Sequence, residues 1–188
     1  MQIQDVKKLN EIAEDKINVY SLEVIQRVVK DEQCKEILTT CGIAANVAPY
    51  IEFLPEEEGG FQPLRDFMKK HAADDVWEKD FFDGVYIIGF HDNNYIALED
   101  EGKVIYIDYE EYTKEYVNDS LEDFLCCIIK FNFMIEEYYE IDPEGDFFEE
   151  GFTEERIEEF VKYIKGLDKG AVGENTFWNL VIEECREL

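Results

Sequence analysis

The sequence predicts an α+β fold in a single domain, with a mainly antiparallel sheet flanked by helices. Three observations lead to this prediction. Residues 85–108 hold three runs rich in β-forming residues, separated by turn residues. Stretches with a helical spacing of apolar residues lie on both sides of this region. The chain has 188 residues, of which 46% are hydrophobic, so it can bury a core of ordinary size despite its high charge.

The N-terminal part is predicted to be mainly helical. Apolar residues recur at helical spacing over residues 3–17, and we expect residues 1–19 to form a peripheral helix of the domain that spans residues 1–188. A second helix is predicted over residues 21–29. A third is predicted over residues 31–40, ending at Gly42, where glycine can adopt the left-handed conformation that closes a helix.

The middle of the chain carries the predicted sheet. Residues 50–54 alternate as a strand does, and residues 64–72 are predicted as a short helix. Residues 85–90, 95–99 and 103–108 are predicted to form adjacent antiparallel strands. Two turn signals separate these strands: His91-Asp-Asn-Asn94 and Asp100-Glu-Gly102.

The C-terminal part is predicted to be helical again. Ser120, with Asp123 three residues later, predicts the capped start of a helix through Ile135. Because that helix is apolar nearly all round, we expect it to be buried. Further helices are predicted to begin near Thr153 and to run from Thr176 to Glu187. Two aromatic residues of these helices are predicted to be buried: Phe124 and Trp178.

Charge restricts the partners of the protein. Forty-six acidic residues oppose 18 basic ones, giving a formal net charge of −28. Nucleic acid and anionic membranes repel such a chain, so we expect a basic protein partner, no nucleic acid and no membrane. The N-terminus lacks a signal-like apolar region, and the longest apolar run, residues 125–135, is too short to span a bilayer. Five cysteines suggest reduced thiols and a cytoplasmic protein.

No set of residues predicts catalysis. The two histidines, His71 and His91, are expected at a helix end and in a turn. The pair Cys126-Cys127 lies inside the apolar helix, where core packing is the expected role. Neither zinc spacing nor a phosphate-binding glycine loop occurs. We therefore expect no catalytic residues, no metal and no cofactor.

Several short motifs occur in the order typical of one superfamily. The most distinctive motif is the box Val117-Asn118-x-Ser120-Leu121-x-x-Phe124-Leu125. The motifs before it in the chain are Ile37-Leu-Thr-Thr-Cys-Gly-Ile43, Tyr86-Ile-Ile-Gly89, and Ile96-Ala-Leu with Gly102-Lys-Val104, and the motif after it is Phe177-Trp178. This set resembles the SUKH superfamily of Smi/Knr-like immunity proteins, and the box resembles one subfamily in particular. Ala44 stands where the family usually has proline.

The resemblance implies an α+β fold without catalytic residues. It also implies a non-enzymatic immunity protein that occludes the active site of a bacterial toxin domain, a nuclease or a deaminase. Two alternatives stay open: an adaptor or scaffold domain without a toxin partner, and a hydrolase that uses clustered acids and a metal.

Two surfaces are candidates for binding the partner. One is the edge of the meander formed by the three predicted strands, which we favour because turns carried on a sheet are rigid. Its acidic residues are Asp92, Asp100, Glu101, Asp108, Glu110 and Glu111. The other is an aromatic and acidic segment between residues 136 and 159, which has twelve acids and one base. Its candidate residues are Glu144, Asp146, Phe147, Glu149 and Glu150.

Overall fold

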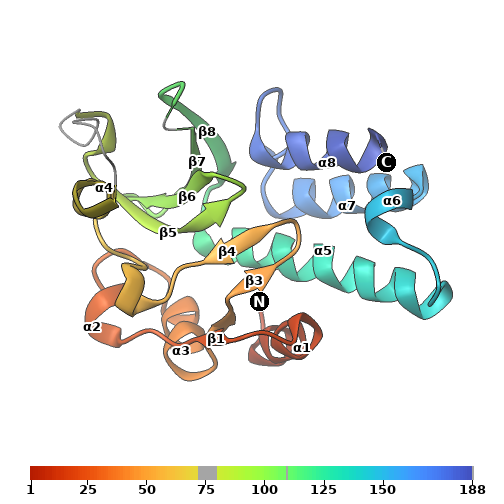
Figure 1. The fold of residues 1–188 in the computed structure, drawn as a ribbon, viewed down its shortest axis with the longest axis horizontal. Helices are drawn as coiled ribbons and strands as arrows, with labels where there is room; N and C mark the ends of the chain where they lie inside the picture. Colours follow the sequence, from red (N-terminus) through yellow and green to blue (C-terminus); the bar gives the residue numbers. More distant parts are fainter. Residues whose placement is uncertain (72–79, 109, 188) are drawn as a thin grey trace.

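A computed structural model describes residues 1–71, 80–108 and 110–187 of the chain. A six-stranded antiparallel sheet lies beside a group of helices, and a separate two-stranded ladder lies near the N-terminal helices (Figure 1). The predicted α+β class is confirmed.

The elements alternate along the chain as helical, extended and helical regions. The helices are α1 (Ile3–Ala13), α2 (Leu22–Ile25), α3 (Glu32–Thr40), η1 (Glu56–Glu58), α4 (Leu64–His71), η3 (Asp80–Phe82), α5 (Leu121–Ile141), α6 (Phe147–Glu150), α7 (Glu154–Leu167) and α8 (Phe177–Glu187). The strands are β1 (Ile17–Asn18), β2 (Ile43–Ala44), β3 (Asn46–Val47), β4 (Ile51–Phe53), β5 (Val85–His91), β6 (Asn94–Glu99), β7 (Val104–Asp108) and β8 (Thr113–Asn118).

The sheet follows chain order, β3-β4-β5-β6-β7-β8, with every neighbouring pair antiparallel. The three predicted strands of the meander are confirmed as β5, β6 and β7. Asp92 adopts the left-handed conformation at φ 53°, which suits the two-residue turn between β5 and β6. Strands β3 and β8 were not predicted, and they extend the sheet on its two sides.

Both faces of the meander are buried, which explains why its strands read as continuous apolar runs. Ile96 and Leu98 point into the larger core, which the long helix α5 also lines. Their neighbours Tyr95 and Ala97 point into a smaller core beneath α4. Figure 1 shows α4 at the far end of the sheet from α7 and α8.

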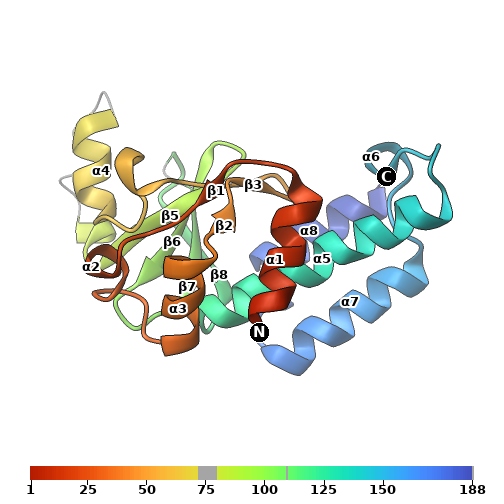
Figure 2. The same ribbon diagram turned by 90° about the horizontal axis from the view of Figure 1, so that it is seen from below.

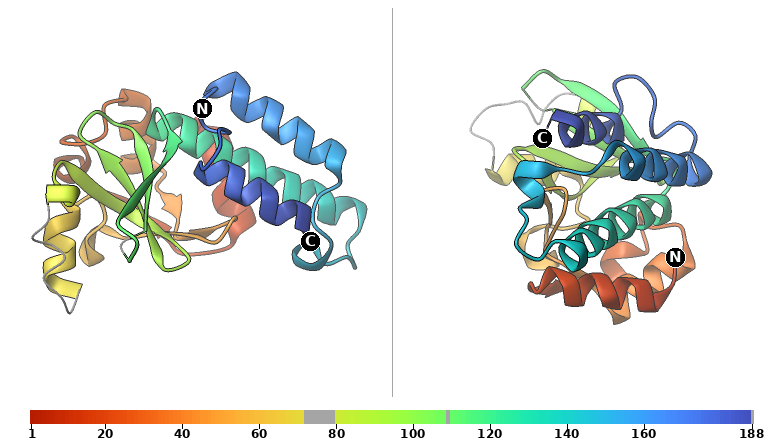
Figure 3. Two further views of the ribbon diagram at one scale, coloured as in Figure 1. Left: turned by 90° about the horizontal axis from the view of Figure 1, so that it is seen from above. Right: turned by 90° about the vertical axis from the view of Figure 1, so that its right-hand side faces the viewer.

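Helix α5 is the centre of the helical layer. Ser120 caps it as predicted: the Ser120 hydroxyl oxygen accepts a hydrogen bond from the backbone N–H of Asp123 at 3.1 Å. The helix continues past the predicted end at Ile135 as far as Ile141. Helix α1 crosses it on one side (Figure 2), and α7 and α8 run along another (Figure 3). Phe124 is fully buried within this arrangement, as predicted.

The asparagine of the Val-Asn-x-Ser box joins β8 to α8. Asn118 is fully buried, and its side-chain oxygen accepts a hydrogen bond from the indole N–H of Trp178 at 2.9 Å. Trp178 is also fully buried, as predicted. Nearby, Asp168 accepts hydrogen bonds from the Tyr116 hydroxyl at 2.5 Å and from the backbone N–H of Asp119 at 3.0 Å. Burial and the bond to Asp168 raise the pKa of Tyr116, so its hydroxyl stays a donor.

The predicted N-terminal helices are partly wrong. Helix α1 ends at Ala13 because Glu14 adopts the left-handed conformation at φ 49°, and Ile17 then begins a strand. Helix α1 is also part of the core rather than peripheral, since Val6 and Leu9 are buried in the larger cluster. The helix predicted over residues 21–29 is the single turn α2. Helix α3 matches its prediction, including the left-handed Gly42 after its end.

Candidate functional site

His91 does not lie in a turn as predicted. It is the last residue of β5, only 5% exposed, and neither ring nitrogen has a hydrogen-bond partner within the described residues. Its ring packs edge-on against Phe177 at 4.9 Å between centroids. Burial lowers the pKa of His91, so the ring is neutral near pH 7. The nearest carboxylate of the described residues, that of Asp92, lies 3.7 Å from Nδ1, which is too far for a hydrogen bond, so His91 is a core residue here. His71 ends α4 as predicted, stacked on Phe67 at 4.4 Å.

The cysteine pair of α5 belongs to the core as well. Cys126 and Cys127 are buried in α5, and the cysteines of the described chain are not disulfide-bonded. Burial raises the pKa of both thiols, which disfavours the reactive thiolate. The described residues contain no cluster of three or more histidine, cysteine, aspartate or glutamate side chains that could hold a metal ion. In the same residues, no helix is long and apolar enough to cross a bilayer.

The predicted acidic residues of the meander are divided between its two ends. Because β5 to β8 are antiparallel, the β5–β6 and β7–β8 turns lie at one end and the β6–β7 turn lies at the other. The first end, which we call the acidic sheet end, carries the side chains of Asp92, Asp108, Glu110 and Glu111. The opposite end carries Asp100 and Glu101. The six residues therefore do not form one surface.

The acidic sheet end is strongly negative. The Asp108 carboxylate accepts hydrogen bonds from the backbone N–H groups of Glu110 and Glu111, both at 2.9 Å, and so holds the turn. Burial, with Asp108 nearby, raises the pKa of Glu115 on β8. Burial, with Asp92 nearby, raises the pKa of Glu184 on α8. Carboxylates of the β5–β6 turn, β7, β8 and α8 therefore contribute to the negative charge of this end.

The aromatic and acidic segment is only partly what the sequence predicted, because its aromatic candidate is buried. Phe147 is 3% exposed and packs against Phe152 at 4.4 Å and Phe131 at 6.3 Å, so it belongs to the core instead of an exposed binding surface. Glu144, Asp146 and Glu150 remain exposed. The Tyr138 hydroxyl donates to the Glu150 carboxylate at 2.5 Å, which raises the pKa of Tyr138 to about 12. The side chain of Glu149 lies outside the described residues.

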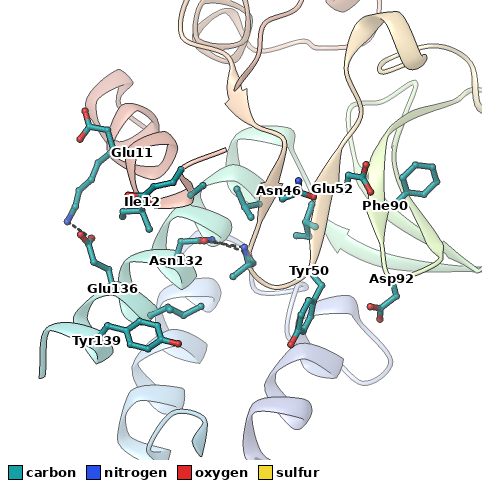
Figure 4. Close-up of a pocket in the computed structure, with 17 residues that line it drawn as sticks. Glu11, Ile12, Asn46, Tyr50, Glu52, Phe90, Asp92, Asn132, Glu136 and Tyr139 are labelled. Atoms are coloured by element: carbon teal, nitrogen blue, oxygen red, sulfur yellow. Dashed lines mark hydrogen bonds and ion pairs between the residues drawn. The ribbon is translucent and has the colours of Figure 1, made fainter. Parts of the chain in front are cut away.

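A groove with a volume of about 970 Å³ surrounds the tip of the β3–β4 hairpin (Figure 4). Its walls come from α1, the hairpin, the β5–β6 turn and α5. The lining residues are Lys8, Glu11, Ile12, Ala13, Glu14, Asn46, Val47, Ala48, Tyr50, Ile51, Glu52, Phe90, Asp92, Asn132, Ile135, Glu136 and Tyr139. Asp92 belongs both to the groove and to the acidic sheet end.

The hairpin tip is fixed in place by Asn132 of α5. The side chain of Asn132 accepts a hydrogen bond from the Ala48 N–H at 3.2 Å and donates one to the Ala48 carbonyl at 2.8 Å. It donates another to the Ile128 carbonyl, in its own helix, at 2.9 Å. Of the candidate residues named from the sequence, Asp92 alone lines this groove, although Glu136 and Tyr139 belong to the predicted segment of residues 136–159. An asparagine in the middle of an apolar helix was the signal that could have indicated the contact to the hairpin.

The chain matches the SUKH-4 immunity protein family over residues 10–184. The chain belongs to this family. Membership of the SUKH superfamily, predicted from the ordered motifs, is thereby confirmed, while the subfamily suggested by the box stays a prediction. No curated protein and no solved structure matches the chain.

The SUKH-4 family consists of immunity proteins, which protect against a toxin. The exposed residues around the groove include four carboxylates and one aromatic ring, and they are Glu11, Glu14, Glu52, Asp92 and Tyr50. Such a surface suits the binding of a partner.

Proposed function

We propose that this SUKH-4 protein neutralises a cognate bacterial toxin domain, a nuclease or a deaminase, by covering its active site without any enzymatic step. The observation that supports this most is the acid excess, 46 acidic against 18 basic residues, in a member of an immunity family. Toxins that act on nucleic acid need basic clefts for phosphate groups. A negatively charged protein is steered toward such a cleft and competes with the substrate there.

The acidic sheet end is the surface that we assign to the first encounter. Asp92, Glu110 and Glu111 are exposed there, and their turns are fixed by the sheet that carries them. The same charge repels nucleic acid and anionic lipid, so the partner is a basic protein. The encounter takes place in the cytoplasm, where the substrates of a nuclease or a deaminase are found.

The test uses the toxin domain encoded by the gene beside this one. Association rates are measured at low and at high salt for the wild type and for two matched charge reversals, Asp92→Lys with Glu111→Lys and Asp100→Lys with Glu101→Lys. The first pair lies at the acidic sheet end, and the second lies at the opposite end and serves as its control.

We expect the wild type to inhibit the toxin and to associate about tenfold or more faster at low salt than at high salt. The reversal at the acidic sheet end should remove most of this salt dependence, and the reversal at the opposite end should change it little. A wild-type protein that leaves the toxin fully active contradicts the proposed function. Inhibition with no salt dependence contradicts the electrostatic part alone.

A further inference from the structure

We infer that the groove around the hairpin tip binds an arginine-bearing segment of the toxin. This inference rests on the proposed function and adds to it a site and a recognised side chain. The groove is the place where apolar and aromatic surface, negative charge and a fixed backbone occur together.

The interior of the groove is apolar. Val47 and Ile51 of the hairpin are buried beneath it, and Ile12 of α1 and Ile135 of α5 are half-buried along its sides. A volume of about 970 Å³ accommodates several side chains of a partner. Apolar surface of this kind can pack against the methylene groups of a long side chain.

The rim of the groove is acidic. Five of its lining residues are acids, and they are Glu11, Glu14, Glu52, Asp92 and Glu136. Among the lining residues Lys8 is the single base, and its ammonium group already lies 3.0 Å from the Glu136 carboxylate. At least four carboxylates therefore have no basic residue opposite them within the groove lining. Their charge complements a cationic side chain of the partner.

Tyr50 stands in the middle of this arrangement. It is 62% exposed, and in Figure 4 it extends from the hairpin tip with Tyr139 on one side and Asp92 on the other. An exposed tyrosine ring with carboxylates beside it suits a guanidinium group. A guanidinium stacks on an aromatic face and donates two parallel hydrogen bonds to a carboxylate, a geometry that the ammonium group of lysine does not match. Tyrosine and arginine are also the residues that most often dominate binding energy at interfaces.

The position of Tyr50 is set before any partner arrives. The loop between β3 and β4 has only three residues, and Asn132 holds its first residue, Ala48, through two hydrogen bonds. The groove then loses little conformational freedom on binding, which favours affinity.

Other occupants fit the groove less well. Nucleic acid is repelled by the carboxylates of the rim. A second copy of this chain brings a formal charge of −28 to the same surface, so self-association there is disfavoured. A basic protein segment is the partner that the charge of the rim selects.

The first experiment needs no toxin. The ¹⁵N-labelled protein is titrated with an acetylated and amidated peptide, Gly-Arg-Arg-Gly, and with the matched peptide Gly-Glu-Glu-Gly, while backbone amide signals are followed by NMR. We expect saturable shifts around Ala48, Tyr50 and Asp92 with the arginine peptide alone. In Tyr50→Ala the peptide should bind at least about fivefold more weakly. The inference is overturned if the arginine peptide shifts the signals of Asp100 and Glu101 as much as those of the groove. It is also overturned if the peptide causes the same shifts in Tyr50→Ala as in the wild type.

The second experiment separates this inference from the proposed function. The dissociation constant of the toxin domain is measured for the wild type, Tyr50→Ala, Tyr50→Phe and Tyr163→Ala, the last being a control at a partly exposed tyrosine of α7. We expect Tyr50→Ala to raise the constant about 30-fold and the other two variants to change it little. A toxin bound equally well by Tyr50→Ala refutes the groove and leaves the function intact. An arginine peptide bound in the groove, together with a toxin that the wild type does not neutralise, refutes the function and leaves the groove intact.

Discussion

The hydrogen bond between Asn118 and Trp178 should make a measurable contribution to the stability of the fold. Both side chains are fully buried, and the indole N–H donates to the Asn118 oxygen at 2.9 Å. Asn118→Leu keeps a similar volume and removes the acceptor, so the indole N–H is left without a partner in the core. An unsatisfied buried donor costs about 1–3 kcal/mol. The Asn118 amide also reaches Asp168, but at 3.5 Å this contact is long and contributes little.

A double-mutant cycle isolates this bond. Trp178→Phe removes the donor and leaves the Asn118 oxygen unsatisfied, whereas the double variant removes both groups. The free energy of unfolding is measured by urea titration for all four proteins, with equal m-values as the condition for comparison. We expect the double variant to be less destabilised than the sum of the single ones by about 1 kcal/mol or more.

The matched control is Asn93→Leu in the exposed β5–β6 turn, which should change stability by less than about 0.5 kcal/mol. Additive effects of the two core substitutions, within about 0.5 kcal/mol, would show that this bond does not hold α8 to the sheet.

Three further predictions concern stability. Ser120→Ala should lower the free energy of unfolding by about 0.5–2 kcal/mol because the helix cap is lost. Phe124→Ala should lower it by about 3–5 kcal/mol because it leaves a cavity. Both are measured by urea unfolding, and no loss of stability in either variant would refute the packing described for α5. Asn132→Leu should cost about 1–3 kcal/mol and shift the NMR signals of the hairpin, because Ala48 loses both of its side-chain hydrogen bonds; an unshifted hairpin would be contrary to that. Burial lowers the pKa of His91, so the unfolded chain binds the proton more readily than the folded chain. The free energy of unfolding of the wild type, relative to that of His91→Phe, should therefore be highest above pH 6.5 and fall as the pH drops below it. A difference between the two proteins that is independent of pH would contradict this.

The sequence predicted the elements whose signals are local. The β5–β6 turn was readable because aspartate and asparagine tolerate the left-handed conformation found at Asp92. The start of α5 was readable because the Ser120 cap and the apolar run after it are adjacent in the chain. Glycine after α3 marked the end of that helix in the same way, at Gly42.

Elements that depend on tertiary contacts were not predicted. Strand β3 has two residues, which is too short for a periodic pattern, and the loop that joins it to β4 is held by Asn132 from a distant helix. Strand β8 was missed because only Val117 and Asn118 of its residues are buried. His91 was placed in a turn because the strand pattern seemed to end at Phe90, yet β5 continues by one residue.

The same reason explains what was missed in the candidate site. The groove combines α1, the hairpin and α5, which are separated by many residues in the chain, so composition could indicate its charge but not its place. The aromatics of residues 136–159 looked like an exposed surface because they alternate with acids. Phe147 instead packs with Phe131 and Phe152, while Glu144, Asp146 and Glu150 are exposed.

The most direct test of the account is hydrogen exchange of the protein alone and bound to its toxin domain. We expect slower exchange in the complex at the hairpin, residues 46–53, and at the β5–β6 turn, residues 91–94. We expect no change at the β6–β7 turn, residues 99–103. Protection of residues 99–103 with unchanged exchange at the hairpin would place the toxin on the opposite end of the sheet and contradict both the acidic sheet end and the groove as its binding surface.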